Sequence, residues 1–457
     1  MKLFNTLTSK KQVFKPLRSG KVSLYACGPT VYQSPHIGNM RSYLFEDILR
    51  RVLEYNGYTV KHIINVTDVG HLTGDGDIGA DKVEESAKSK GVKASDVTKK
   101  YFDEFKTDMK ALNILMPSKF AWATKYIPEQ KKLVERIFSK KYAYETEDGI
   151  YFDTQKFGKY GKLGGLNKRD PEEMQSRTGV DPDKKHPFDF ALWKFSIGPR
   201  LQEWKSPVDH KKMGFPGWHL ECSAISTEEL GQPFDIHAGG IDHVTTHHNN
   251  EIAQSEAAYG KPLANYWIHG EHLLMKDTKM SKSLGNVALL ADLTAQGFEP
   301  LAFRYLVLTS QYRNRLNFTE DGLEAAQTAL NKLRAVMAPR LKGGKVIEKY
   351  QKKFKTAVSD DLNTAEGLAV VWEMVKSKAD VADVQATLLD MDQVLGLGLD
   401  KWKPAKVDKT VLELAEKREQ ARANKEWAES DRIRDEINKK GYDISDTPNG
   451  YQLFKRQ

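Results

Sequence analysis

The chain has 457 residues, of which 40% are hydrophobic and 29% are charged, so it can bury several hydrophobic cores and we expect two to four domains. Lys and Arg exceed Asp and Glu by 70 to 62, and the resulting net charge of +8 favours a polyanionic partner without identifying one. No apolar run approaches the roughly 18 to 20 residues that span a bilayer, and the N-terminus MKLFNTLTSKKQVF lacks a signal-peptide pattern, so we expect a cytoplasmic protein with no membrane contact, whose two cysteines form no disulfide framework.

The first 66 residues contain a strand, a loop, a helix and a second strand. The apolar stretch 22–26 predicts the first strand, and residues 40–55 carry apolar side chains at helical spacing. The run TVKHIINV at 59–66 predicts the second strand. In an open α/β sheet, ligands bind beyond the carboxyl ends of the strands, which indicates the loop 27–39 and the loop after Val66.

The rest of the chain is more helical. Residues from about 95 to 205 mix amphipathic helices with a short strand pattern at 149–153, which indicates an insertion into the α/β core. From residue 319 the apolar positions alternate spacings of three and four, as in a helical bundle. A Gly343-Gly344 hinge, a second amphipathic run at 364–375 and a linker at 396–404 follow.

Two strings carry groups suited to a nucleotide. In CGPTVYQSPHIGN, His36, Gly38 and Asn39 stand at the start of the predicted helix, where free backbone NH groups attract phosphate. In KMSKS, Lys279 and Lys282 present two ammonium groups suited to a polyphosphate. Taken alone, the first string could be a polar loop that caps a helix and the second a solvated basic loop.

A third string, GDGDIG at 74–79, has the spacing of a dinucleotide loop. Its aspartates would repel a pyrophosphate, and no helical pattern begins there, so we reject that function for it.

Metal ligands are a further possibility. Cys27 ends the first strand, Cys222 lies in PGWHLECSAIS, and His247 and Glu251 lie four residues apart in HHNNE, on one face of a helix. Two thiolates, one imidazole and one carboxylate make a plausible zinc set if these distant segments converge. Each residue alone is more often an ordinary core or surface residue.

HIGN and KMSKS, in that order and separated by an insertion, resemble the two signatures of class I aminoacyl-tRNA synthetases. The strings CGPTVY, GWHLECS, HAGGIDH, HHNNEIAQSEA, KMSKSLGN and IRDEINKKGYDISDTPNGY resemble cysteinyl-tRNA synthetases from one end of the chain to the other. The resemblance implies activation of L-cysteine by ATP with Mg²⁺, and transfer of the cysteinyl group to the 3′ end of tRNA(Cys). It also implies one Zn²⁺ per chain, which binds the substrate thiol.

The resemblance assigns residues to these roles. The zinc ligands are Cys27, Cys222, His247 and Glu251. The catalytic residues are His36, Asn39, Lys279 and Lys282. The same four residues bind ATP, together with Gly38 and Ser281. The amino-acid pocket contains Gly28, Thr67, Asp68, Trp218 and Asp242.

The sequence departs from the commonest family pattern in three places, which indicates a divergent branch. Asn39 replaces the second His of HIGH, Asn249 replaces a Glu, and Thr245-Thr246 replaces a Phe-Pro pair. The loop 69–80 is also long, and we assign it no role.

The resemblance also divides the chain. Residues 1–318 are expected to form a Rossmann-like α/β catalytic domain with a parallel sheet, including the insertion at about 95–205 and the KMSKS region at about 270–318. An α-helical bundle of the anticodon-binding type is expected at 319–397, and a small tRNA-binding module at 405–457, where Arg432, Arg434, Lys439 and Lys440 are candidate contacts. We expect a monomer.

Two other functions fit part of the pattern. A ligase joining cysteine to a small amine, as in the mycothiol pathway, would share the zinc and nucleotide motifs but would not need the last roughly 140 residues. A non-catalytic zinc-dependent RNA-binding protein would have no reason to contain HIGN and KMSKS together.

Overall fold

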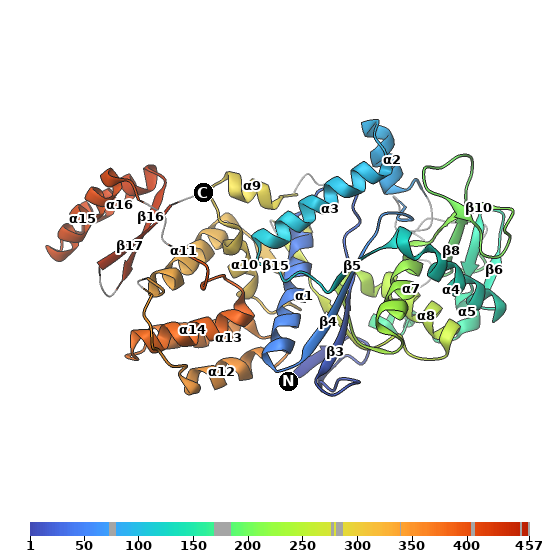
Figure 1. Ribbon diagram of the computed structural model, residues 1–457, viewed down its shortest axis with the longest axis horizontal. Helices are drawn as coiled ribbons and strands as arrows, with labels where there is room; N and C mark the ends of the chain where they lie inside the picture. Colours follow the sequence, from blue (N-terminus) through green and yellow to red (C-terminus); the bar gives the residue numbers. More distant parts are fainter. Residues whose placement is uncertain are drawn as a thin grey trace.

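A five-stranded parallel sheet forms the centre of the computed structural model, which describes residues 1–72, 79–168, 184–275, 278–279, 287–338, 340–403, 407–447 and 450–455 (Figure 1). The strand order is β12-β11-β3-β4-β5. The strands are β3 (Lys21–Ala26), β4 (Thr59–Val66), β5 (Lys119–Trp122), β11 (Phe234–Gly240) and β12 (Ala264–Gly270). The sheet confirms the predicted α/β class.

The strand-helix-strand unit at the start of the chain is confirmed. Helix α1 (Ile37–Tyr55) begins three residues before the predicted run, because His36 and Asn39 form a reciprocal capping box. Gly57, with φ +90°, ends the helix and turns the chain into β4, whose bounds match the predicted strand.

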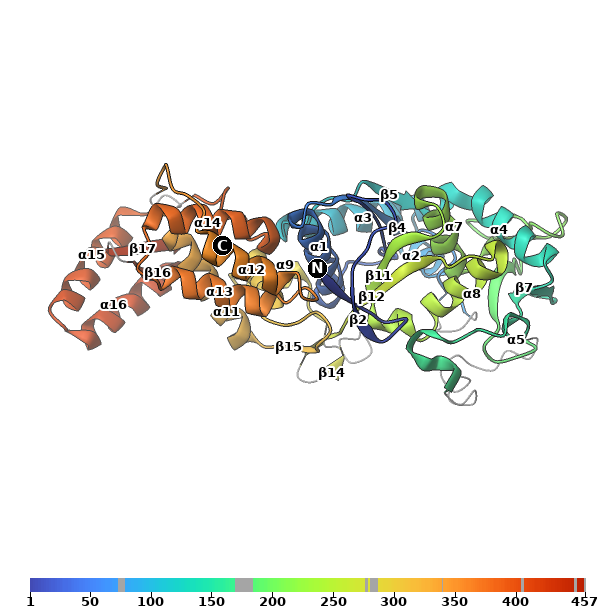
Figure 2. The same cartoon turned by 90° about the horizontal axis from the view of Figure 1, so that it is seen from below.

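Alternating side chains of the central strands enter two different cores. Leu24 and Ala26 of β3 pack in the core that contains α1 and α3 (Ala94–Ala111), whereas Tyr25 and Cys27 pack in the core that contains α7 (Trp218–Leu230) and α8 (His247–Tyr259). The sheet is therefore covered on both faces, with α1 on one side and α7 and α8 on the other (Figure 2).

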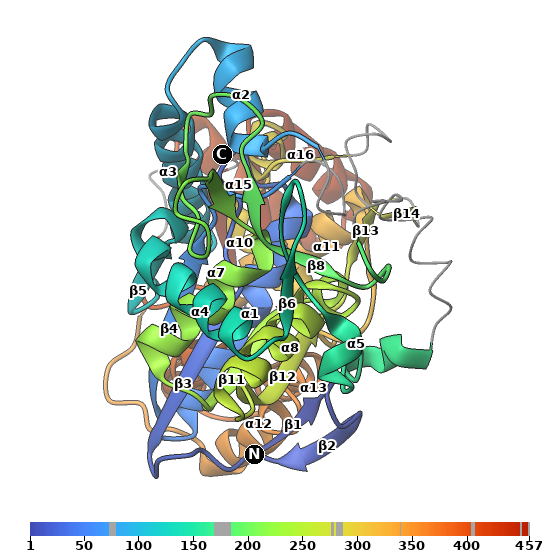
Figure 3. The ribbon, with the colours of Figure 1, turned by 90° about the vertical axis from the view of Figure 1, so that its right-hand side faces the viewer.

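A second sheet, which is antiparallel with the order β6-β7-β8-β10-β9, lies mostly in the predicted insertion, but its strand β10 lies beyond residue 205 (Figure 3). Its strands are β6 (Ala143–Glu145), β7 (Gly149–Phe152), β8 (Phe190–Phe195), β9 (Trp204–Lys205) and β10 (Met213–Pro216), with α4 (Ile127–Ser139) and α5 (Thr154–Phe157) beside them. The same region supplies β5 to the parallel sheet and α3 to its core, so the antiparallel part begins later than residue 95.

The helical region and the antiparallel sheet lie on opposite sides of the parallel sheet (Figure 1). The helical region contains α11 (Glu320–Val336), α12 (Glu348–Val358), α13 (Thr364–Val375) and α14 (Val381–Leu395). Beyond it, α15 (Lys409–Ala423), α16 (Trp427–Lys439), β16 (Tyr442–Thr447) and β17 (Gly450–Lys455) form a small unit with its own core. The predicted helix at 364–375 is confirmed residue for residue.

The remaining described elements connect these parts. They are β1 (Lys2–Asn5), β2 (Lys10–Val13), α2 (Lys82–Lys90), η1 (Ala123–Tyr126), η2 (Leu163–Lys168), η3 (Ile241–Val244), β13 (Leu273–Met275), β14 (Thr278–Lys279), α9 (Leu290–Ala295), α10 (Pro300–Leu308) and β15 (Leu316–Phe318). Among the helices of the described ranges, none combines the length and apolar character needed to cross a membrane.

Candidate active site

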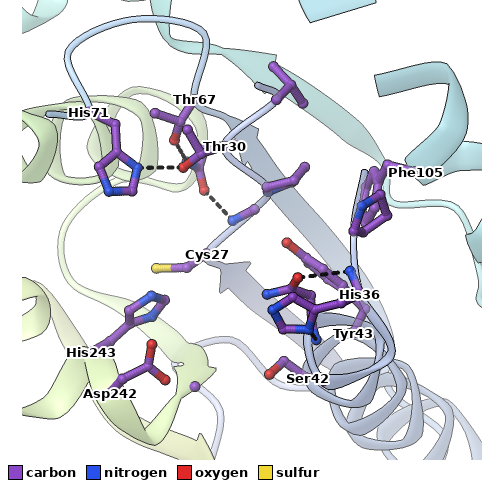
Figure 4. Close-up of a pocket in the computed structure, with 18 of the residues that line it drawn as sticks. Cys27, Thr30, His36, Ser42, Tyr43, Thr67, His71, Phe105, Asp242 and His243 are labelled. Atoms are coloured by element: carbon purple, nitrogen blue, oxygen red, sulfur yellow. Dashed lines mark hydrogen bonds between the residues drawn. The ribbon is translucent and has the colours of Figure 1, made fainter. Parts of the chain in front are cut away.

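A cavity of about 360 Å³ opens at the carboxyl ends of the parallel strands, as expected for a doubly wound sheet. Its wall combines the loop after β3, one face of α1, the segment after β4, and the starts of α7 and α8. Ten of the predicted site residues line it: Cys27, Gly28, His36, Gly38, Asn39, Thr67, Trp218, Cys222, Asp242 and His247. Figure 4 shows Cys27, Asp242 and His243 facing the cavity from one side and His36 from the other.

Four potential metal ligands converge behind this cavity. One donor atom each from Cys27, Cys222, His247 and Glu251 lies within 4.8 Å of the other three, and all four residues are buried. Cys27 directly follows β3, Cys222 lies on α7, and the other two lie four residues apart on one face of α8. The convergence that the sequence left open is therefore present in the fold.

Neighbouring imidazoles orient the ligand side chains. Nδ1 of His247 lies 2.8 Å from Nδ1 of His219, which leaves Nε2 of His247 directed at the cluster, 3.1 Å from Oε1 of Glu251. Apart from this contact, that oxygen has no hydrogen-bond partner among the described residues, whereas the other carboxylate oxygen of Glu251 lies 2.8 Å from Nε2 of His237. Lone pairs therefore converge on one point, with an outer layer of histidines behind them, as is typical of metal sites.

The two thiols differ in acidity. Burial raises the pKa of Cys27. Burial opposes ionisation of Cys222 as well, but hydrogen bonds with Cys27 and His247 bring its pKa down to about 6. One thiolate is thus favoured even without a cation, and a divalent cation would favour both.

A second group of donors overlaps the first. Cys27, His237, His248 and Glu251 also lie within 4.8 Å of one another. Neither His237 nor His248 lines the cavity, whereas Cys222 and His247 do. Three members of the first group and one of the second line the cavity, so the first group is the better placed to hold a cation that faces a ligand there.

The backbone of Gly28 packs against β4. A Cβ at this position would lie 1.7 Å from the carbonyl oxygen of Asn65, so only glycine fits. Its NH donates to Oδ1 of Asn65 at 2.7 Å, and the hydroxyl of Thr67 donates to Glu221. These contacts fix the wall beside Cys27.

Asp68 does not join the other predicted pocket residues. Its two carboxylate oxygens accept hydrogen bonds from the backbone NH (2.9 Å) and the hydroxyl (2.6 Å) of Thr124, at the start of η1. These contacts give Asp68 a structural partner outside the cavity. The side chain of Lys279 and all of Ser281 and Lys282 lie outside the described residues, as do residues 73–78 of the long loop.

At the start of α1, His36 and Asn39 hold each other. The NH of Asn39 donates to Nδ1 of His36, and the NH of His36 donates to Oδ1 of Asn39, both at 3.1 Å. Asn39 thus fulfils a capping role in place of the family's histidine. The NH groups of Ile37 and Asn39 are paired with Ala288 and His36, which leaves the NH of Gly38 and the positive end of the helix dipole at the cavity, where they suit an anion.

The departure at Asn249 also has a physical reason. This buried amide donates to the carbonyls of Leu163 (3.1 Å) and Val244 (2.7 Å) and accepts from the NH of Leu163 (3.1 Å). A glutamate could not donate to the two carbonyls. Asn249 therefore anchors η2 and lies outside the ligand set.

The sequence analysis missed His71, which lies on the cavity wall. Its ring stacks on Trp218 with a centroid distance of 4.1 Å, Nδ1 lies 2.6 Å from the hydroxyl of Thr30, and Nε2 lies 2.7 Å from Nζ of Lys82 (Figure 4). An ammonium group only donates, so Nε2 accepts and Nδ1 carries the proton given to Thr30. The hydroxyl proton of Thr30 is then available to another acceptor.

Comparisons with known proteins agree with this geometry. The model of the tRNA synthetases class I (C) catalytic domain matches residues 13–328, and that of the DALR domain matches residues 353–400. The chain is 47% identical to cysteine-tRNA ligase 1 of Burkholderia lata, over 99% of this chain and 96% of that protein. It is 41% identical to cysteine-tRNA ligase of Novosphingobium aromaticivorans, over 98% and 95%.

Solved structures support the fold. A LeuRS-tRNA-LeuAMS ternary complex from Agrobacterium radiobacter is similar with a TM-score of 0.62 at 11% identity, covering 85% of this chain and 87% of that one. Mycobacterium tuberculosis methionyl-tRNA synthetase bound by methionyl-adenylate has a TM-score of 0.55 at 16% identity, covering 82% and 90%. At these identities the likeness concerns the architecture.

Proposed function

The chain belongs to the cysteinyl-tRNA synthetase family of class I tRNA synthetases, and we propose that the cavity at the sheet edge is where it activates L-cysteine with ATP before transfer to the 3′ end of tRNA(Cys). The observation that supports the proposal is that the two ends of one cavity carry different chemical groups. Potential metal ligands suited to sulfur lie at its base, and a helix start suited to phosphate lies at its other side.

The donor set fits zinc. Two thiols, one imidazole nitrogen and one carboxylate oxygen, all buried, match the ligand types and number that zinc takes, and Oε1 of Glu251 lies 3.1 Å from Nε2 of His247 within this cluster. Zinc bound there supplies a soft Lewis acid that prefers a thiolate to the hydroxyl of serine. Cys27, Cys222 and His247, which line the cavity, would hold it in contact with the substrate.

The chain's own residues orient the rest of the amino acid. Trp218 and His71 stack as one flat wall beside the cluster, and Thr30 has a hydroxyl proton to donate, because its oxygen accepts from His71. We propose that this proton is donated to the substrate carboxylate. Gly28, Thr67 and Asp242 complete the pocket, while Asp68 supports it through Thr124.

At the other side, the start of α1 receives the phosphates. The NH of Gly38, the positive end of the α1 dipole and the ring of His36 would stabilise charge on the α-phosphate when a carboxylate oxygen of cysteine attacks it and pyrophosphate leaves. Lys279, Ser281 and Lys282 are proposed to contact the leaving phosphates, with Mg²⁺ accompanying ATP. The cysteinyl group then passes to a terminal hydroxyl of the tRNA.

The parts beyond residue 319 favour tRNA over a small amine as the acceptor. Relatives named cysteine-tRNA ligase match almost the whole chain, including the helical region and the terminal unit. We propose that 319–397 and 405–457 bind the anticodon side of the tRNA, that the catalytic domain spans 1–318, and that the enzyme works in the cytoplasm as a monomer.

The test is a pair of assays on the full chain. Cysteine-dependent ATP/pyrophosphate exchange should occur and serine should fail to support it, and purified tRNA(Cys) should be charged with cysteine. Exchange without tRNA charging would favour the small-amine ligase. Absence of both would favour the RNA-binding alternative.

A further inference from the structure

Glu46 is a buried carboxyl that the proposed mechanism does not use. Helix α1 lines the cavity with Asn39, Ser42, Tyr43 and Glu46, which are spaced so that they share one helix face. The Glu46 side chain is 1% exposed. Within the described part of the chain, neither of its two oxygens has a hydrogen-bond partner.

Such a group is costly to the fold unless something in the cavity pairs with it. Burial raises the pKa of the Glu46 carboxyl well above its usual range, because no neighbouring cation compensates for lost hydration. The adjacent Asp47, in contrast, faces away from the cavity and pairs with Arg304 at 2.6 Å and Arg51 at 2.7 Å. The helix thus has one satisfied and one unsatisfied carboxyl side by side.

Glu46 lies at the amino-acid end of the cavity. Seven residues separate it from Asn39, which corresponds to about 10 Å along a helix, so it is remote from the phosphate end. Glu46 and Cys27 line the same cavity. Two other acidic groups lie on the cavity wall: Glu271 pairs with Arg315 at 3.3 Å, and Asp242 interacts electrostatically with His243 and His269.

We propose that Glu46 is the counter-ion of the substrate's α-ammonium group. The inference rests on the proposed binding of cysteine thiol at the metal-ligand cluster. The thiol and the ammonium of cysteine are on adjacent carbon atoms, so a substrate whose sulfur is at Cys27 presents its ammonium a short distance away. A magnesium ion fits less well, because it needs several oxygen ligands and accompanies the phosphates.

The inference predicts separate effects on binding and stability. Glu46→Gln should raise the KM for cysteine at least about tenfold, the effect of losing a charge-assisted hydrogen bond, while the KM for ATP stays unchanged. Tm should stay level or rise, because the variant removes a buried ionisable group that the fold does not pair. Glu46→Asp keeps the charge on a shorter side chain, so its KM for cysteine should lie between those of the unaltered enzyme and Glu46→Gln.

The deciding experiment uses two incomplete substrates as competitive inhibitors of pyrophosphate exchange. Cysteamine has the ammonium but no carboxylate, and 3-mercaptopropionate has the carboxylate but no ammonium. Glu46→Gln should weaken inhibition by cysteamine at least about tenfold and leave inhibition by 3-mercaptopropionate unchanged. Glu54→Gln, an exposed position on the same helix paired with Arg50 at 2.8 Å, is the matched control and should change neither.

Equal weakening of both inhibitors, or of neither, would overturn the role of Glu46 while leaving the proposed function intact. Failure of both thiols to compete with cysteine on the unaltered enzyme would instead overturn the thiol site on which the inference rests. If Glu46→Gln does not fold, the same comparison is made with Glu46→Asp, in which inhibition by cysteamine should weaken more than inhibition by 3-mercaptopropionate.

Discussion

The two ends of the cavity are built in different ways. At the metal-ligand end, every donor is buried and is fixed by the sheet, α7 or α8, with His219 and His237 behind the ligands. At the nucleotide end, Asn39 is exposed, His36 is partly exposed, and both are held mainly by each other at the start of α1. Amino-acid recognition therefore depends on tertiary packing, and phosphate binding on a helix start that is formed locally.

The largest expected effect comes from breaking the buried end. Cys222→Ser should lose zinc and cysteine selectivity, with at least about a 100-fold fall in kcat/KM for exchange, because the hydroxyl is a much weaker ligand than a thiolate. Metal content by mass spectrometry and exchange with cysteine and serine measure this. The far-ultraviolet circular dichroism should stay native. A variant that keeps both zinc and selectivity would remove Cys222 from the ligand set.

Breaking the nucleotide end should spare the metal. His36→Ala should lower kcat for exchange about 100-fold by removing a group at the developing phosphate charge, with zinc content unchanged. Steady-state kinetics beside metal analysis separate the two ends. Zinc loss in His36→Ala would mean that the ends are not independent.

A smaller effect is expected between the ends, at Thr30. Thr30→Val removes the hydroxyl that accepts from His71 and should raise the KM for cysteine about tenfold. Thr30→Ser keeps the hydroxyl, so its KM for cysteine should be close to that of the unaltered enzyme. Inhibition by 3-mercaptopropionate should weaken in parallel in the valine variant. Unchanged inhibition would show that the hydroxyl does not contact the carboxylate.

The smallest effect concerns the helix start itself. Asn39→Ala removes one half of the capping box and should lower the free energy of unfolding by about 1 kcal/mol. Thermal or urea unfolding checks this. A loss several times larger would show that Asn39 supports more than the local helix end.

The same contrast explains what the sequence could predict. The first helix and the strand at 59–66 follow from local periodicity, and the helix start follows from capping residues, so the nucleotide end was accessible from a short stretch of chain. The gathering of Cys27 with Cys222 required the family resemblance, because no local pattern brings segments so far apart together.

The contacts of residues that depend on tertiary packing could not be predicted from the sequence. Nothing in the pair Glu46-Asp47 indicates which carboxyl faces the cavity, since this depends on Arg304, more than 250 positions away. His71 acquires its role from Lys82 and Trp218. Asp68 looked like a pocket residue at the end of a strand, but Thr124 of a later element takes up its oxygens.

The central claim is that Cys27, Cys222, His247 and Glu251 hold one metal that receives the substrate sulfur. X-ray absorption at the zinc edge, on the purified enzyme with and without cysteine, tests this most directly. We predict two sulfur neighbours at about 2.3 Å in the free enzyme and three when cysteine is bound. One sulfur with two imidazoles would point to His237 and His248 instead, and a shell that cysteine leaves unchanged would contradict recognition of the substrate through the metal.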